Sequence, residues 1–140
     1  MIEFRHVSFS YDFRGEQEDI RKKDSLRDIN LKVNDGECVL LCGKSGCGKT
    51  TITRLVNGLV PNFYTGKLTG EVLLDGRNIS EMPIYEVASH VGSVFQNPRT
   101  QFFNMDTDSE IAFGMENLAL PRKQIEEKVA STAKDLEIEN

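Results

Sequence analysis

The segment from Gly43 to Thr50 carries the residues with the clearest chemistry in this sequence. It consists of Gly-Lys-Ser-Gly-Cys-Gly-Lys-Thr, which matches the pattern of a phosphate-binding loop. Glycines let the backbone turn tightly beside a phosphate, and successive backbone N–H groups form a nest for anions. In such a loop the lysine, here Lys49, reaches the β- and γ-phosphates, and the hydroxyl of Thr50 ligates Mg²⁺. The sequence therefore predicts a site for a nucleoside triphosphate with Mg²⁺.

The residues on both sides predict the elements that must position this loop. Residues 37–42 form a short apolar run, typical of a strand that is buried on both faces of a parallel sheet. Residues 51–59 place their apolar side chains at helical spacing. Strand, loop and helix follow in the order that the motif requires. The helix would add the positive end of its dipole to the phosphate site.

The other patterns predict a small antiparallel sheet followed by helices. Strands are expected over residues 2–11, with a bulge where the alternation slips, over residues 26–33, and on both sides of Asp75-Gly76. A short helix over residues 83–89 and an apolar strand over residues 91–95 should follow. Thr107 and Glu110 match a capping box ahead of a helix, and Pro121 suits the start of another. The charged residues 14–23 predict a solvated loop.

Composition limits the classes of protein that fit. The chain has 140 residues with 17 basic and 22 acidic side chains, a net charge of −5, which disfavours a general nucleic-acid binder. No apolar run approaches the roughly 20 residues of a membrane span, and the first residues lack a signal-peptide core. The three cysteines match no common zinc pattern. We interpret Cys38, Cys42 and Cys47 as reduced packing residues of a cytosolic protein, with Cys47 accessible in the loop.

Together these residues resemble an ABC-type ATPase, and more narrowly the ATPase subunit of energy-coupling factor transporters. The resemblance covers the whole chain and rests on Val7–Tyr11, Leu26–Glu37, Gly70–Gly76 and Val91–Pro98, with residues 101–118 typical of the energy-coupling factor branch. The implied fold is α/β, an incomplete ABC ATPase domain. It would consist of a P-loop NTPase core of the RecA type, an antiparallel β subdomain and the start of a helical subdomain. The implied boundaries are residues 1–100 for the core with its β subdomain and residues 101–140 for the truncated helical part.

The resemblance also implies roles for single residues. Lys49 and Gln96 are the catalytic candidates, and Gln96 would ligate Mg²⁺ together with Thr50 and orient the attacking water. Tyr11 would stack on adenine. The remaining nucleotide contacts would come from the loop and the first helical turn: Gly43, Ser45, Gly46, Cys47, Gly48, Lys49, Thr50 and Thr51, with Thr51 at the α-phosphate. Two plainer alternatives stay open, Tyr11 as a core residue at a strand end and Gln96 as a surface residue.

Three parts of the family's hydrolytic machinery have no match in this sequence: the Leu-Ser-Gly-Gly-Gln signature, the acidic-ended Walker B strand and the switch histidine. We therefore expect this chain to be the N-terminal part of a longer, transport-coupled ATP hydrolase, and to be inactive by itself with exposed apolar edges.

The resemblance also implies cofactors and partners. The implied cofactors are ATP and Mg²⁺. The implied partners are a second ATPase subunit, as a homo- or heterodimer, and a transmembrane coupling subunit that contacts region 96–118, with no nucleic acid. Through that subunit the protein would lie on the cytoplasmic face of the cell membrane.

Other classes of function fit these residues less well. A soluble ABC-type ATPase acting on nucleic acid or ribosomes conflicts with the acidic balance and with the match over residues 101–118. A GTPase should carry an Asn-Lys-x-Asp motif, which is absent, and no acceptor-binding lid of a kinase is evident. A non-catalytic, nucleotide-binding short form stays open. The sequence does not name a transported solute, because the family handles vitamins and transition-metal ions alike.

Overall fold

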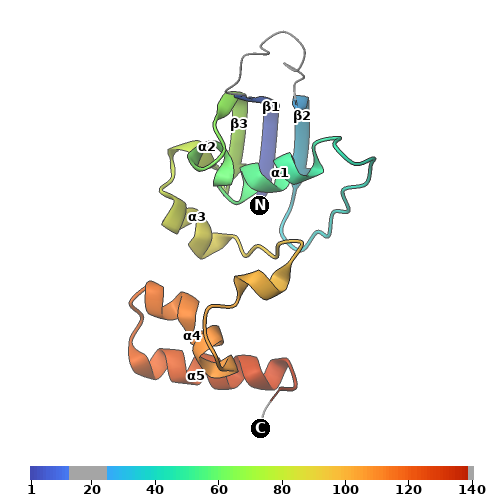
Figure 1. Cartoon of the computed structure of the whole chain (residues 1–140). Coiled ribbons are helices and arrows are strands. Elements are labelled where there is room, and N and C mark those ends of the chain that lie inside the picture. Colours follow the sequence, from blue (N-terminus) through green and yellow to red (C-terminus); the bar gives the residue numbers. More distant parts are fainter. Residues whose placement is uncertain (13–24, 139–140) are drawn as a thin grey trace. The chain divides into compact units, whose positions relative to one another are not determined.

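The structure is a computed structural model that describes residues 1–12 and 25–138. The chain divides into two compact units, Met1–Ser93 and Val94–Asn140 (Figure 1). The charged stretch 14–23, predicted as a solvated loop, lies outside the described residues. Among the helices that the structure describes, none combines the length and the apolar character that a membrane crossing requires.

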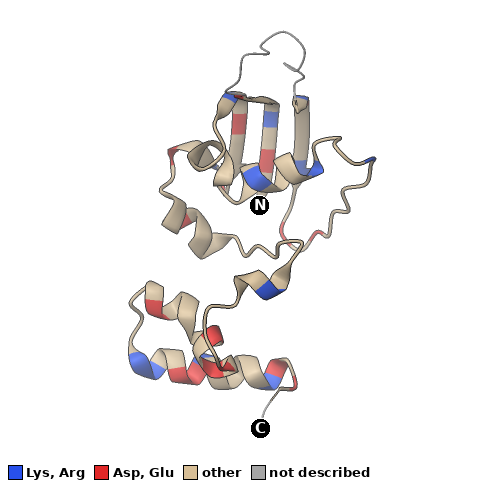
Figure 2. Ribbon diagram, viewed as in Figure 1, with Lys and Arg blue, Asp and Glu red and all other residues tan. Residues whose placement is uncertain are grey.

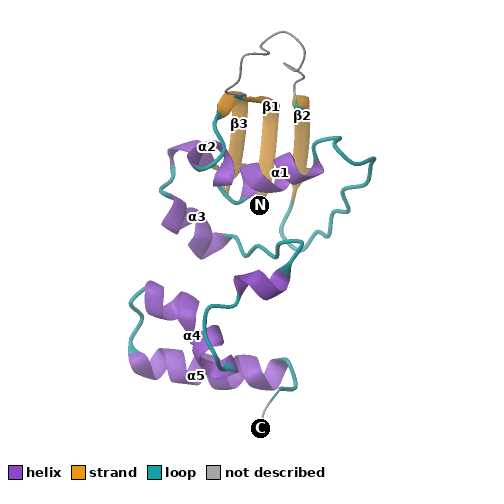
Figure 3. Cartoon of the chain, viewed as in Figure 1, coloured by secondary structure: helices purple, strands orange, loops and turns teal. Residues whose placement is uncertain are grey.

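The first unit is built on a four-stranded antiparallel sheet in the order β2-β1-β3-β4 (Figure 3). Its strands are β1 (Ile2–Tyr11), β2 (Leu26–Val33), β3 (Gly66–Leu74) and β4 (Arg77–Asn78). The predicted strands around Asp75-Gly76 are confirmed. The predicted bulge is confirmed too, because the pairing of β1 with β3 shifts register between Arg5 and Ser8.

Helices cover one face of this sheet and enclose the core. They are α1 (Lys49–Val56), α2 (Leu59–Asn62), the 3-10 turn Ile79–Glu81 and α3 (Ile84–His90). Buried side chains from the strands and helices pack together: Phe4, Val7, Phe9, Leu26, Leu55, Val60, Val72, Leu74, Ile79, Met82 and Val87. Burying one such side chain contributes about 1.5–3 kcal/mol, so this cluster fixes α1 against the sheet.

Two predicted strands, residues 37–42 and 91–95, are wrong. Both segments lack regular secondary structure, and Leu40 and Val94 are 84% and 86% exposed. An extended segment becomes a strand only when its N–H and C=O groups pair with a neighbouring strand. All strands in the described part of the chain belong to the antiparallel sheet, and none pairs with these segments. These two segments therefore expose apolar side chains, as expected for an incomplete domain.

The loss of the strand over residues 37–42 also corrects the interpretation of the cysteines. Cys38 and Cys42 are free and exposed, so they are not packing residues. Cys47 is free and exposed as well, so it is not a packing residue either, although the prediction that its thiol is accessible in the loop is confirmed. No group of three or more potential metal-binding side chains occurs within residues 1–12 and 25–138.

The second unit contains a 3-10 turn, Pro98–Gln101, and two helices, α4 (Thr107–Asn117) and α5 (Arg122–Asp135). The predicted capping box is misplaced by one residue. Asp106 precedes the helix and accepts the backbone N–H of Ser109 at 2.8 Å, so Asp106 is the N-cap and Thr107 is already helical. The Glu110 carboxylate instead turns back and accepts the N–H groups of Phe103 and Asn104.

This cap should make the stability of the helical unit depend on pH. The N–H of Ser109 lowers the pKa of Asp106 below its usual value near 3.9. The carboxylate therefore stabilises the fold fully above about pH 4–5, and its contribution is lost as pH falls through the folded pKa. Asn caps a helix about as well as Asp but does not titrate. We expect Asp106→Asn to leave the neutral-pH urea midpoint nearly unchanged and to flatten its fall between pH 5 and 3.

The measurement is urea unfolding followed by circular dichroism at several pH values. Asp135→Asn is the matched control, since Asp135 is an exposed residue at the far end of α5 and is not a helix N-cap. An Asp106→Asn profile that falls as steeply as the wild-type profile would show that the cap does not control this pH dependence.

Candidate nucleotide-binding site

A hydrogen-bonded turn leads the chain out of β2 toward the phosphate-binding loop. The carboxylate of Glu37 accepts the backbone N–H of Asn34 at 2.7 Å and its side-chain amide at 3.1 Å. These bonds, the backbone one first, lower the pKa of Glu37. The predicted turn at Asn34–Gly36 is confirmed, with Gly36 at a φ of 76°. The turn sets the direction of the chain ahead of residues 38–42.

The loop itself requires glycine at Gly48. This residue has a φ of 97°, a conformation that side-chain-bearing residues rarely adopt. A Cβ there would lie 2.6 Å from the carbonyl oxygen of Ser25 and 2.7 Å from Cδ2 of Leu26. Gly48 therefore lets the loop pass directly against the start of β2. It is also the N-cap of α1 and supplies no side-chain cap, so the first N–H groups of α1 remain available to an anion.

Lys49 folds back over the loop that precedes it. Its Nζ donates to the carbonyl oxygens of Gly43 at 2.7 Å and Lys44 at 2.8 Å, and lies 3.6 Å from Sγ of Cys47. A lysine ammonium has three donors and acts as a compact positive charge. The sequence predicts that Lys49 contacts the phosphates of a nucleotide. In the structure its ammonium group lies beside the backbone of the loop.

Thr50 begins the exposed side of α1, where its hydroxyl could serve as a metal ligand. Nucleotide-bound Mg²⁺ is held through one or two protein groups together with phosphates and water. The hydroxyl oxygen of Thr50 is a donor of the hard type that this ion prefers. The donor chemistry therefore fits Mg²⁺ without a cluster of carboxylates.

Tyr11, at the end of β1, is bonded to α1 through its hydroxyl. The Tyr11 oxygen lies 3.2 Å from Oγ1 of Thr51, and Nη1 of Arg54 donates to it at 3.1 Å. The ring of Phe9 meets the Tyr11 ring edge-on at 4.7 Å. The guanidinium of Arg54 also lies 3.9 Å from the ring centre of Tyr64.

Sequence reasoning missed Arg54 and Tyr64. One signal was present: Thr51 and Arg54 stand three apart, and residues at that spacing share one face of a helix. Nothing in the spacing of Tyr11 and Arg54, 43 positions apart, could have paired them.

Gln96 belongs to the other compact unit, whereas all other predicted site residues belong to the first. It is exposed and lies just ahead of the 3-10 turn Pro98–Gln101. The segment around it is held locally, because the side-chain oxygen of Gln101 accepts the backbone N–H of Phe95 at 2.8 Å.

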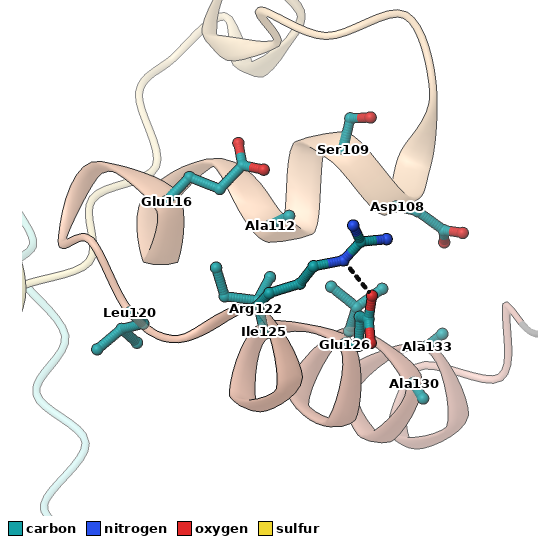
Figure 4. Close-up of a pocket in the computed structure, with 11 residues that line it drawn as sticks. Asp108, Ser109, Ala112, Glu116, Leu120, Arg122, Ile125, Glu126, Ala130 and Ala133 are labelled. Carbon is teal, nitrogen blue, oxygen red and sulfur yellow. Dashed lines mark hydrogen bonds and ion pairs between the residues drawn. The ribbon is translucent and has the colours of Figure 1, made fainter.

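The helical unit also contains a groove of about 1050 Å³ between α4 and α5 (Figure 4). Its walls combine apolar and acidic side chains, with Arg122 bonded to Glu126 across one turn of α5 at 2.7 Å. The acidic lining residues are Asp108, Glu116 and Glu126, and the larger apolar ones are Leu120, Ile125 and Val129. No residue of α5 is buried, so its apolar side is only partly covered by α4.

The loop and the helix that follows it define a nucleotide-binding domain of the phosphate-loop class. Residues 26–140 match the protein family described as ABC transporter, and the chain belongs to that family as an ATP-binding domain. Members of this family bind ATP and generally hydrolyse it. A protein described as an ABC transporter ATP-binding protein, from Treponema denticola, is 51% identical over 140 residues, covering 100% of this chain. The chain spans only 27% of that relative's length.

Two solved structures share the fold. One is cbiO1 of Clostridium perfringens, described as part of the ABC transporter complex cbiONQ, with a TM-score of 0.76 at 24% identity. The match covers 99% of this chain and 51% of cbiO1. The other is a dimeric ATP-binding cassette in a post-hydrolysis state with ADP and Pi, with a TM-score of 0.71 at 22% identity, covering 100% of this chain and 59% of that one. The predicted fold class, an incomplete ABC ATPase domain, is confirmed.

Proposed function

We propose that this chain is the nucleotide-binding, N-terminal part of an ATPase subunit that powers solute uptake, of the energy-coupling factor type. The observation that carries the proposal is the loop ahead of α1, in which the Lys49 ammonium lies within 2.8 Å of two loop carbonyls. Such a loop takes the phosphates of MgATP, with Lys49 at the β- and γ-phosphates and Thr50 on the metal. The backbone amides of residues 43–51 would complete this contact.

The proposed catalytic partner of the loop is Gln96. A neutral amide can ligate Mg²⁺ and orient a water without adding charge to the site. In the sequence, Gln96 follows closely after the boundary at Ser93, so its contact with the γ-phosphate would be coupled to movement of the helical unit. This chain contains no signature, Walker B strand or switch histidine, so hydrolysis would need residues outside this sequence.

The proposed partners are a second ATPase subunit and a transmembrane coupling subunit. One structural relative is a dimer of an ATP-binding cassette, and the other is part of an ABC transporter complex, which supports this proposal. Region 96–118 exposes large apolar side chains, among them Phe102 at 65%, Phe103 at 75% and Met105 at 105%. An apolar surface of this kind fits a protein partner. A transmembrane partner bound at this surface would hold the protein at the cytoplasmic face of the membrane.

Nucleic acid is a less suitable partner. Charges of both signs lie on β1 and on β3 (Figure 2). On β1 the pair is explicit, since Nη2 of Arg5 donates to the Glu3 carboxylate at 2.9 Å. Binding to a phosphate backbone needs an unpaired basic surface, so we do not favour a soluble ATPase that acts on nucleic acid or ribosomes.

The test is reconstitution of the full natural protein that contains this chain, together with the membrane proteins that purify with it, in lipid vesicles. We expect MgATP hydrolysis to depend on the membrane proteins. We also expect a vitamin or a transition-metal ion from a test panel to be taken from the opposite side of the membrane and to accumulate on the side that carries the ATPase. ATP hydrolysis that responds to RNA or ribosomes, and is indifferent to the membrane proteins, would favour the soluble alternative.

A further inference from the structure

Tyr11, Thr51 and Arg54 form a bridge between the end of β1 and the first two turns of α1. The Tyr11 hydroxyl is the centre of this bridge, 3.2 Å from the hydroxyl of Thr51 and 3.1 Å from Nη1 of Arg54. Thr51 is only 5% exposed. A buried hydroxyl without a partner is costly, so the bond to Tyr11 fixes the direction of the Thr51 side chain.

The other side of the bridge is also fixed. Arg54 is half-buried, and its guanidinium lies 3.9 Å from the centre of the Tyr64 ring, a cation–π contact. The Tyr11 and Tyr64 rings meet edge-on at 6.3 Å. Arg54 therefore cannot swing away from the Tyr11 hydroxyl without losing its contact with Tyr64.

The bridge joins a strand end to the helix that begins the phosphate site. Thr51 stands two residues after Lys49, in the first turn of α1, where the N–H groups available to an anion lie. A shift of this turn would move those N–H groups and the Lys49 and Thr50 side chains together. Because small displacements of positioning groups are costly, the anchor of this turn should matter for phosphate binding.

We propose that Tyr11 is a positioning residue for the phosphate site, acting through its hydroxyl on Thr51 and Arg54. This inference rests on the proposed nucleotide-binding function and deepens it. It differs from a role in stacking on the base, which needs the ring of Tyr11 but not its hydroxyl. A ligand with phosphates and no base separates the two roles.

The experiment compares binding of MgATP and of magnesium tripolyphosphate, by calorimetry, in the full natural protein and its variants. We expect Tyr11→Phe to weaken both ligands by a similar factor of about 3–10, the size of one net hydrogen bond. Arg54→Met removes the bridge from the other side and should weaken both ligands as well, which keeps the test available if Tyr11→Phe does not fold. Tyr85→Phe, at a tyrosine of α3 that is 70% exposed, is the matched control and should change neither.

Each other outcome has a definite meaning. Unchanged binding of both ligands by Tyr11→Phe and Arg54→Met would overturn the inference while leaving the nucleotide site intact. Weaker MgATP binding with unchanged tripolyphosphate binding would also overturn it and assign Tyr11 to the base. A wild-type protein that binds neither ligand would overturn the proposed function itself, and with it this inference.

Discussion

Lys49→Ala is expected to weaken MgATP binding by roughly 10–100-fold in the full natural protein. The substitution removes charge-assisted hydrogen bonds to phosphate oxygens that are together worth about 1.5–3 kcal/mol, and about 1.4 kcal/mol corresponds to a factor of ten. It also removes the bonds from Nζ to the carbonyl oxygens of Gly43 and Lys44. The loss should therefore combine a missing phosphate contact with a less ordered loop. Equilibrium titration with a fluorescent ATP analogue measures the change.

A matched lysine separates the effect of this site from that of net charge. Lys128→Ala removes the same charge from the exposed surface of α5 and should leave MgATP affinity unchanged. Thermal unfolding of both variants shows whether the fold survives. An unchanged affinity in Lys49→Ala would contradict the assignment of residues 43–50 as the phosphate-binding loop, whatever the family of the chain.

Local sequence patterns were sufficient where the structure depends on neighbouring residues. The glycines of the loop, the helix after it and the turn at Asp75-Gly76 are set by backbone geometry within a few positions. The slip in alternation along β1 revealed the bulge, because side chains on a strand change face at every residue. The resemblance to ABC ATPases followed from the same segments, and the family match over residues 26–140 supports it.

Local patterns failed where structure depends on distant partners. The apolar runs at residues 37–42 and 91–95 have the composition of buried parallel strands, yet composition supplies no neighbour to pair with. The helix cap failed for a smaller reason: Asp106 and Thr107 are both good cap residues, and only the bond to Ser109 decides between them. The bridge from Tyr11 to Arg54 joins residues from separate elements, so no local pattern contains it.

Gln96→Ala should show a different kinetic pattern from Lys49→Ala. We expect MgATP affinity to stay within about fivefold of wild type, because the phosphate contacts come from the loop and one lost neutral hydrogen bond is worth only about 1 kcal/mol. Turnover should fall by about 100-fold, the scale on which misplacing a reacting group lowers a rate. Steady-state hydrolysis in the full natural protein, measured beside equilibrium binding, separates the two effects.

The control for Gln96 is another glutamine, Gln124→Ala, which is exposed on α5 and should change neither constant. The two candidate roles of Gln96 then give opposite results. A catalytic amide lowers turnover at constant affinity, since its contribution is made mainly in the transition state. A glutamine that only supports the chain ahead of Pro98–Gln101 would, on removal, lower thermal stability while leaving the turnover of the folded protein unchanged. A fall in affinity as large as that of Lys49→Ala would instead place Gln96 in ground-state nucleotide binding, and the catalytic assignment would have to be withdrawn.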